Sequence, residues 1–189
     1  LSSPQKELKP FATSFVDGSR NAGVLTYPPG ITNRRECTIV LWVKVDYSKT
    51  SLYHHIVTIG SGIAERLWWW YREDERNWTI TTSIGNSMSS FAWAKKSDVP
   101  EGWRMFSISW NPDQMNFYVD DEKVFTVNNP KLSEALDNAE LQVGHWSGWP
   151  GGRPLNMLID ELLILPYAAT DEEIKAWYEA KKPFIDQDE

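Results

Sequence analysis

Two groups of side chains have the types and spacing of ligand contacts. They are Trp146, Trp149 and Arg153 in a segment rich in glycine and proline, and Trp69, Tyr71 and Arg72 in a run of aromatic residues. An indole face stacks well on the apolar C–H face of a pyranose ring. A guanidinium donates paired hydrogen bonds to hydroxyls or to a carboxylate. These residues therefore predict contacts with a carbohydrate. The group around Trp146 is the first candidate for the binding site, and the group around Trp69 is the second.

The aromatic run divides its rings between two directions. Successive side chains of a strand point to opposite faces, so Leu67, Trp69 and Tyr71 share one face. Trp68 and Trp70 share the other face. At least one of these two faces is a candidate binding surface.

The chain holds eleven tryptophans in 189 residues, beside a single cysteine. We expect more indole than a core requires, because a fully buried ring N–H needs a hydrogen-bond partner. Trp42, Trp103, Trp110 and Trp177 lie at apolar strand or helix positions and are expected in the core. Residues 145–154 cannot form a regular strand, so their two indoles either contact a ligand or plug the rim of the fold.

The carboxylates do not have a catalytic pattern. Glu73 and Glu75 lie in a polar segment that is typical of a solvated turn between strands. Asp160 and Glu161 are adjacent on a predicted strand, so they should face opposite ways. No serine has the surroundings of a nucleophile elbow. We therefore expect the chain not to be an enzyme.

The histidines and the cysteine do not indicate a metal or redox site. His54 and His55 would diverge on a strand, and no cysteine or carboxylate lies at ligand spacing from them, so we expect loop histidines. Cys37 stands alone at the head of an apolar run and is predicted to be a buried thiol.

The composition limits the partners. A net charge of -7 and a pI of about 5.0 argue against nucleic acid, which favours a basic surface. A neutral polymer or a cation suits this surface better. No run approaches the ~20 apolar residues of a membrane span, so no membrane insertion is expected. The chain begins with Leu1 rather than Met, and we expect it to be part of a larger polypeptide.

The pattern through most of the chain is typical of an antiparallel sandwich, because short β-branched and aromatic runs alternate with turn residues. Residues 38–45 are apolar on both faces and predict a central strand. The alternation over 78–84 predicts a half-buried strand. Residues 103–110 and 115–119 should pair as a hairpin across a turn at Pro112.

A helix is predicted near the C-terminus. Thr170 and Glu173 have the spacing of a capping box, and acidic residues fill the first turn. The helix should end at Lys181 and Lys182, before Pro183. The length fits one domain over 1–189, with flexible ends at 1–10 and 183–189.

Three stretches resemble the laminin G-like jelly rolls of the concanavalin A-like lectin and glucanase superfamily. They are TIVLWVK at 38–44, GWRMFSISW at 102–110 with its hairpin partner MNFYVD at 115–120, and IDELLILPYAATDEEI at 159–174. The resemblance implies an all-β, two-sheet antiparallel jelly-roll sandwich that binds ligand at rim loops or on a concave sheet face. The sequence departs from the family pattern at Asp120 and Asp121, where Asp-Gly is usual. Residues 177–184 resemble the ends of such modules in bacteriophage and prophage tail proteins.

The resemblance also implies a structural Ca²⁺ held by carboxylates and backbone carbonyls. The candidate ligands are Asp160 and Asp17, which approach each other if the two ends of the chain meet. The alternative is that Asp160 accepts hydrogen bonds from backbone N–H groups of the N-terminal segment. Glycan-cleaving members carry the order Glu-x-Asp-x-x-Glu on one strand face, and this order is absent from the sequence.

We therefore expect a noncatalytic carbohydrate-binding module of a larger extracellular, cell-surface or phage tail protein of the virion. Its partner would be a glycan or polysaccharide. The alternative is a structural or protein-interaction domain with buried indoles, and a glycoside hydrolase is the third possibility.

Overall fold

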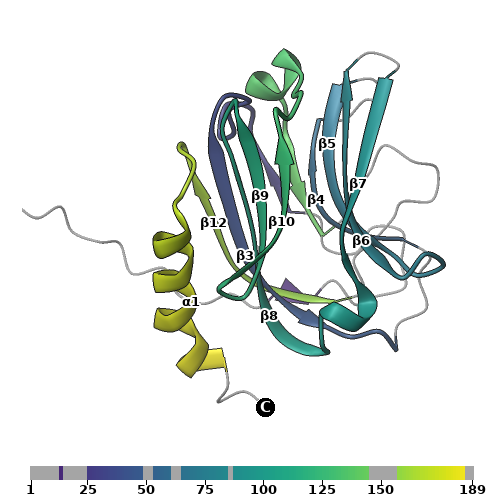
Figure 1. Ribbon diagram of the computed structural model, residues 1–189, viewed down its shortest axis with the longest axis vertical. Coiled ribbons are helices and arrows are strands. Elements are labelled where there is room, and N and C mark those ends of the chain that lie inside the picture. The colour runs from purple at the N-terminus through teal and green to yellow at the C-terminus, as the bar shows by residue number, and fades with distance from the viewer. Residues whose placement is uncertain are drawn as a thin grey trace, which may run out of the picture.

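The computed structural model describes residues 13–14, 25–48, 53–60, 65–84, 87–144 and 157–185. Two six-stranded antiparallel sheets pack face to face, and the helix α1 (Asp171–Ile185) lies against the outer side of the first sheet (Figure 1). This arrangement confirms the predicted all-β, two-sheet jelly-roll sandwich with a C-terminal helix.

The first sheet has the strand order β1-β12-β3-β8-β9-β10. Its strands are β1 (Thr13–Ser14), β12 (Leu158–Leu165), β3 (Cys37–Val45), β8 (Gly102–Trp110), β9 (Gln114–Val119) and β10 (Glu122–Asn128). The strands β8 and β9 form the predicted hairpin, and the side chain of Asn111 closes it by accepting from the backbone N–H groups of Asp113 and Gln114.

The second sheet has the order β2-β11-β4-β5-β6-β7. Its strands are β2 (Leu25–Tyr27), β11 (Leu141–Val143), β4 (Tyr53–Ile59), β5 (Glu65–Arg72), β6 (Asn77–Ile84) and β7 (Ser87–Lys95). Two short 3-10 helices, η1 (Lys96–Asp98) and η2 (Glu134–Asn138), connect strands of the two sheets.

Strand β3 is apolar on both faces because both faces are covered. Ile39 and Leu41 point into the core between the sheets, whereas Val40 and Trp42 point toward α1. Cys37 at the start of the strand is fully buried, as predicted, and burial raises the pKa of its thiol to about 11.

The capping box of α1 is formed as predicted. The Thr170 N–H donates to Glu173 Oε2 at 2.9 Å, and the Glu173 N–H donates to Thr170 Oγ1 at 3.3 Å. Ile174 is fully buried against the first sheet, and Trp177 and Tyr178 pack beside it. The helix thus covers the outer face of the first sheet. Among the described residues, no helix is long and apolar enough to cross a membrane.

Two sequence predictions about the backbone are wrong. The helix α1 continues through Pro183 to Ile185 rather than ending before the proline. His54 and His55 lie in strand β4 rather than in a loop, and both are buried. Their side chains do diverge: the His54 ring lies 5.7 Å from Tyr71, and the His55 ring lies 6.2 Å from Trp70.

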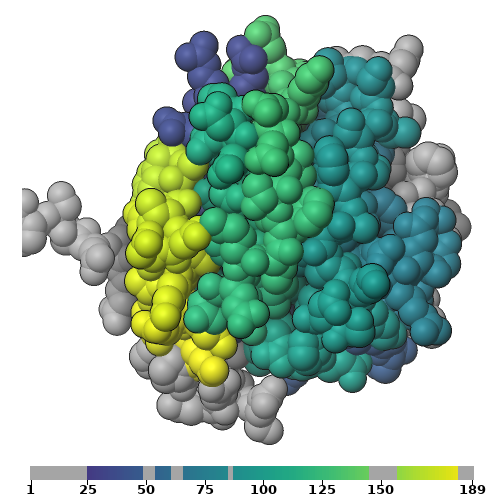
Figure 2. Space-filling model, viewed as in Figure 1, coloured from purple at the N-terminus to yellow at the C-terminus, as the bar shows by residue number. Residues whose placement is uncertain are grey.

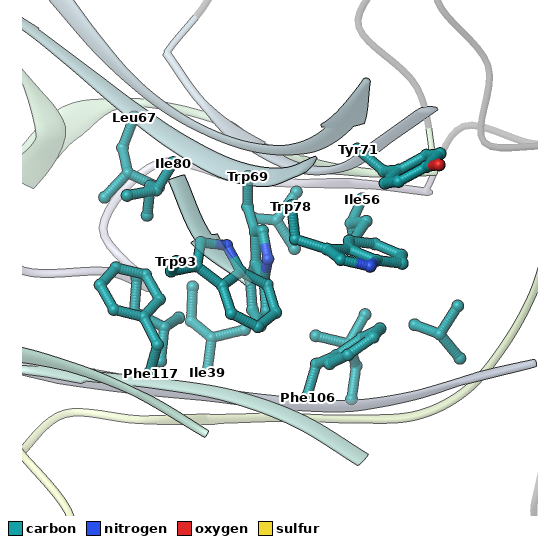
Figure 3. Close-up of a cluster of buried hydrophobic side chains, with 14 of the residues drawn as sticks. Ile39, Ile56, Leu67, Trp69, Tyr71, Trp78, Ile80, Trp93, Phe106 and Phe117 are labelled. Atoms are coloured by element: carbon teal, nitrogen blue, oxygen red, sulfur yellow. The ribbon is translucent and has the colours of Figure 1, made fainter. Parts of the chain in front are cut away.

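The core between the sheets is rich in aromatic rings (Figure 3). Trp69, Trp78 and Trp93 of the second sheet point toward Phe106 and Phe117 of the first. The Trp78 and Phe106 ring centroids are 4.8 Å apart, and the Trp93 and Phe117 rings stack at 5.8 Å. The indole N–H groups of Trp69 and Trp93 are buried without a hydrogen-bond partner among the described residues. The core therefore takes up more indole than the hydrogen-bonding argument predicts.

The other tryptophans expected in the core divide into two pairs. Trp42 and Trp110 are buried, and the Trp110 N–H donates to the Asn33 carbonyl at 2.9 Å. Trp103 and Trp177 are only partly buried, and both pack beside the cluster under α1. The core prediction is thus confirmed fully for the first pair only.

The turn between β9 and β10 departs from a glycine-dependent geometry. Asp120 has a φ of 57°, whereas Asp121 lies outside the left-handed region, so the second turn position does not require glycine. Asp120 Oδ1 also accepts from the backbone N–H of Met105 at 3.0 Å. This bond ties the turn to the neighbouring strand β8.

The two faces of β5 predict losses of different size in the free energy of unfolding. Trp69→Ala should lower the free energy of unfolding by about 3–5 kcal/mol, because its indole fills the core between Trp93 and Phe106. Trp70→Ala should lower it by roughly 1 kcal/mol, because Trp70 is partly exposed on the other face. Urea unfolding followed by circular dichroism measures both values, and equal losses would contradict this assignment of the faces.

Candidate functional site

The register between β5 and β6 decides which aromatic residues enter the core. Trp69 pairs with Ile80 and Tyr71 pairs with Trp78, and all four side chains are fully buried in the core. The prediction that Trp69 and Tyr71 present ring faces to a ligand is therefore wrong. Burial and a hydrogen bond to Glu73 also raise the pKa of the Tyr71 phenol, which donates to the Glu73 carboxylate at 2.8 Å.

Arg72 is engaged in the turn that follows β5. Its Nε donates to Asp74 Oδ1 at 2.6 Å and its Nη2 donates to Asp74 Oδ2 at 2.9 Å. A third bond joins Nη1 to Glu75. The guanidinium thus closes the turn at residues 73–76, and this use competes with the predicted role in ligand binding.

The other side of β5 belongs to a surface that we term the polar–aromatic face. It is the side of the second sheet that points away from the core, and four rows of paired residues cross it. The first row is Thr26, Gln142, Thr58, Trp68, Thr81 and Ser90; the second is His55, Trp70, Thr79 and Ala92; the third is Arg66, Ser83 and Met88; the fourth, at the end of β5, includes Arg72, Asn77 and Lys95. The first row spans all six strands of the sheet.

Arg66, Trp68 and His55 form a packed group on this face. The Arg66 guanidinium lies over the Trp68 ring in a cation–π contact. The His55 ring meets Trp68 edge to face at 6.2 Å and stacks nearly parallel to Trp70 at 6.2 Å. The two indoles are therefore held from two sides by cationic and aromatic neighbours.

Trp70 is fixed by hydrogen bonds along the face. Its Nε1 donates to Thr81 Oγ1 at 3.2 Å, and Thr81 Oγ1 lies 2.9 Å from Ser90 Oγ. Trp70 is partly exposed, and Ser90 is exposed. The chain of bonds thus leads from a partly open indole to the open edge of the sheet.

The middle of the polar–aromatic face is buried although it points away from the core. Thr58, Thr79, Thr81 and Ser83 are at most 5% exposed. The prediction that β6 is half-buried is therefore wrong, although its alternation of polar and apolar side chains is correct. Thr58 and Thr79 hydroxyls have no hydrogen-bond partner among the described residues. Burying such a hydroxyl costs on the order of 1–3 kcal/mol.

The two sheets differ in what covers their outer sides. The first sheet carries α1, which packs on Val40, Trp42, Met105 and Tyr118. In Figure 1, α1 lies beside the first sheet and away from β4 to β7. Of the two outer sheet faces, α1 therefore covers that of the first sheet.

The remaining predicted ligand contacts cannot be placed. Trp146, Trp149 and Arg153 lie outside the described residues, and so does Asp17. Their predicted roles stay predictions.

Asp160 lies at an irregularity of β12, where the pairing with β3 shifts between Asp160 and Leu163. Its Oδ1 accepts from the backbone N–H of Glu161 at 2.8 Å. Glu161 has a φ of 47° and pairs with Lys181 of α1 at 2.8 Å. A break in the strand pattern thus accommodates both carboxylates, and a local N–H partly satisfies Asp160.

The predicted calcium site combines Asp160 with Asp17 and further oxygens, because Ca²⁺ takes six to eight oxygen ligands. Among the described residues, no group of three or more His, Cys, Asp or Glu side chains is arranged to hold a metal ion. Asp17 lies outside the described residues, so the calcium site stays a prediction.

Sequence reasoning placed Trp68 and Trp70 on one of two candidate faces without choosing that face, and it missed His55, Arg66 and the threonines of the polar–aromatic face. The alternation of β6 carries a signal that finds them. Because Trp78 and Ile80 must face the core, the residues paired with them on β5 must do so too. Trp68 and Trp70 then point outward beside Thr81 and Thr79.

The fold and the sequence together define a laminin G-like jelly roll. Residues 17–175 match the family model described as the concanavalin A-like lectin/glucanases superfamily, and the chain belongs to this family. No curated protein sequence matches the chain.

Solved structures share the fold at low sequence identity. Domain 4 of AbnA, a GH43 extracellular arabinanase from Geobacillus stearothermophilus in complex with arabinotriose, is 19% identical, with a TM-score of 0.68 over 86% of this chain and 74% of that one. The receptor binding domain of botulinum neurotoxin D is 15% identical, with a TM-score of 0.63 over 91% of this chain and 44% of that one. A structure of botulinum neurotoxin type C is 11% identical, with a TM-score of 0.57 over 78% of this chain and 36% of that one. Cell entry of that toxin is described as dependent upon interaction with two ganglioside molecules. This chain thus spans less than half the length of the neurotoxin chains.

Two threonines on β6 provide a matched test of the polar–aromatic face. Thr81→Val should destabilise the fold by about 1–2 kcal/mol, because it removes the bonds to Trp70 and Ser90. Thr79→Val should be nearly neutral or stabilising, because the Thr79 hydroxyl is buried without a partner among the described residues. Urea midpoints measure both effects. A larger loss for Thr79→Val than for Thr81→Val would contradict the described geometry.

The calcium prediction has a direct test. If Asp17 and Asp160 hold a structural ion, EDTA should lower the melting temperature, and added Ca²⁺ should restore it. Asp160→Asn should abolish the response. A melting temperature that is constant across the EDTA series would contradict the prediction.

Proposed function

We propose that this chain is a noncatalytic carbohydrate-binding module that holds sugar rings on the polar–aromatic face. The observation that carries the proposal is the partly exposed Trp70 indole, which is held in place by Thr81 and His55. A preordered aromatic ring loses little entropy when a sugar stacks on it. The exposed hydroxyls of Thr26 and Ser90 in the first row can exchange hydrogen bonds with sugar hydroxyls.

The chemistry of this face supports a glycan over other ligand classes. Its rows contain hydroxyl, amide, imidazole and indole groups, the three basic side chains of Arg66, Arg72 and Lys95, and no carboxylate. A neutral polymer suits such a surface better than nucleic acid, which needs many basic side chains. Arg66 could also orient an acidic or hydroxyl-rich sugar through its guanidinium.

The absence of carboxylates from the rows supports the noncatalytic part of the proposal. Glycoside hydrolysis ordinarily uses two carboxyl groups on either side of the scissile bond. Glu73 and Glu75 instead lie in the turn after β5, where they bond Tyr71 and Arg72. Glu161 pairs with Lys181 on the far side of the sandwich.

The similar structures support the ligand class and the modular setting. One is an arabinanase domain solved with arabinotriose, and another is a neurotoxin described as interacting with gangliosides. We propose that this chain likewise belongs to a larger extracellular, cell-surface or phage tail protein. Single-site affinity would be modest, since sugar hydroxyls exchange good contacts with water, and several tethered copies would supply avidity.

The rim segment 145–154 is the second proposed contact region. Trp146, Trp149 and Arg153 would extend the sugar-binding surface beyond the sheet, as their residue types predict. The two regions can be tested with separate variants.

Binding measurements with single variants test the proposal. Isothermal titration with a panel of neutral and acidic oligosaccharides should find a ligand with saturable binding. Trp70→Ala should then weaken the affinity about tenfold, which corresponds to ~1.4 kcal/mol. Trp103→Ala is the matched control, because this partly buried indole lies on the first sheet and should leave the affinity unchanged.

Three outcomes would contradict the proposal in different ways. A double Trp146→Ala, Trp149→Ala variant that loses all binding while Trp70→Ala loses none would move the site to the rim. Shortened oligosaccharide products after incubation would indicate a hydrolase. No binding to any glycan would favour the structural or protein-interaction alternative.

A further inference from the structure

Strand β7 is an open edge of the second sheet. It spans nine residues, and among the described strands it pairs only with β6. In an antiparallel pair, alternate backbone N–H and C=O groups point to the partner, so the others point outward along this edge. Ser87, Met88, Ser89 and Ser90 are all exposed, Met88 at 59%. The described structure therefore presents a row of backbone groups that can accept another strand.

The other three sheet edges carry the features that prevent such pairing. β1 has two residues, and β2 has three and is followed by Pro28 and Pro29. β10 begins with Glu122 and Lys123, and its pairing with β9 shifts just after Lys123. Short length, proline, charge and bulges are the usual protections of an edge strand. The regular half of β7 over residues 87–92 has none of them.

The absence of charge around β7 extends over the whole hairpin. No residue from 77 to 94 is Asp, Glu, Lys or Arg, in a chain where 24% of residues are charged. This is the longest uncharged run in the sequence. Because the chain carries a net charge of -7, a contact through this uncharged hairpin adds no opposed carboxylates to the repulsion between two copies.

We propose that β7 pairs antiparallel with β7 of a second copy of this chain, which joins two second sheets into one continuous sheet. Self-pairing about a two-fold axis places like residues close to one another, and like charges in opposed positions are destabilising. A self-pairing strand must therefore be uncharged near the axis, whereas a strand that binds a different protein has no such requirement.

The charged residue at the end of β7 fits the same arrangement. Lys95 closes the strand. With the axis near Ser89 and Ser90, antiparallel pairing separates the two Lys95 residues by about 35 Å, at roughly 3.4 Å per residue. This distance exceeds the Debye length of about 8 Å at physiological salt, so the two ammonium groups would not oppose assembly.

The two-fold axis would also place both polar–aromatic faces on one side of the joined sheet. Ser90, the last residue of the first row, lies on β7, so the rows of the two copies would meet at the axis. Figure 2 shows the β7 surface in teal beside the green β10, where it is open to the viewer. A bivalent surface would raise the avidity for a repeating polymer, a consequence that rests on the proposed function.

Sedimentation equilibrium of the whole chain tests the pairing without any glycan. The wild-type mass should rise with concentration from the 21.8 kDa of one chain to twice that value. Ser89→Lys should hold the mass at one chain, because two ammonium groups would meet near the axis. Asn128→Lys is the matched control, since it adds the same charge at an exposed position on β10 and should leave the assembly intact.

Cysteine variants test the location of the contact. Cys37 is fully buried, so a new thiol is the reactive one in the folded protein. Ser89→Cys should cross-link into a covalent pair with a short bis-maleimide, whereas Asn128→Cys should not. A single-chain mass at all concentrations would overturn the proposal. So would a Ser89→Lys variant that still assembles, or equal cross-linking at both positions. None of these outcomes bears on glycan binding by the single chain.

Discussion

The pairing of β5 with β6 is the constraint on which the rest of the structure depends. β5 carries aromatic side chains on both faces, so its own sequence does not determine which face enters the core. β6 alternates Trp78 and Ile80 with Thr79 and Thr81, and the register transfers this pattern to β5. Trp69 and Tyr71 enter the core, and Trp68 and Trp70 point away from it. A one-residue shift would reverse both faces.

The sequence predicted those elements of the fold that a single local pattern of residues determines. The apolar run of β3, the β8–β9 hairpin and the capping box at Thr170 are confirmed, because strand periodicity and cap chemistry act within a few residues. The candidate site was less predictable, because its residues come from strands that are distant in the sequence. The burial of His54 and of the Thr79 side of β6 depends on those neighbours rather than on either segment alone.

The expectation that many tryptophans lie on a binding surface is correct only in part. Buried indoles line the core and the layer under α1, and two of the core rings lack an N–H partner among the described residues. Aromatic stacking and apolar burial therefore offset the cost of an unpaired donor. Of the two β5 indoles that point away from the core, Trp68 is buried and Trp70 is partly exposed, so Trp70 is the one that a ligand can reach. The uncharged β6–β7 hairpin beside them suits both a neutral polymer and contact with an identical chain.

Nuclear magnetic resonance of the indole N–H groups tests the central claim, that the polar–aromatic face binds carbohydrate, most directly. With the tryptophans labelled with ¹⁵N, a bound oligosaccharide should shift the Nε1–H signals of Trp68 and Trp70 in a saturable way. The signals of Trp78 and Trp110, whose N–H groups donate to Tyr47 and to the Asn33 carbonyl, should stay in place. Unchanged Trp68 and Trp70 signals in the presence of a glycan that does bind would contradict the account.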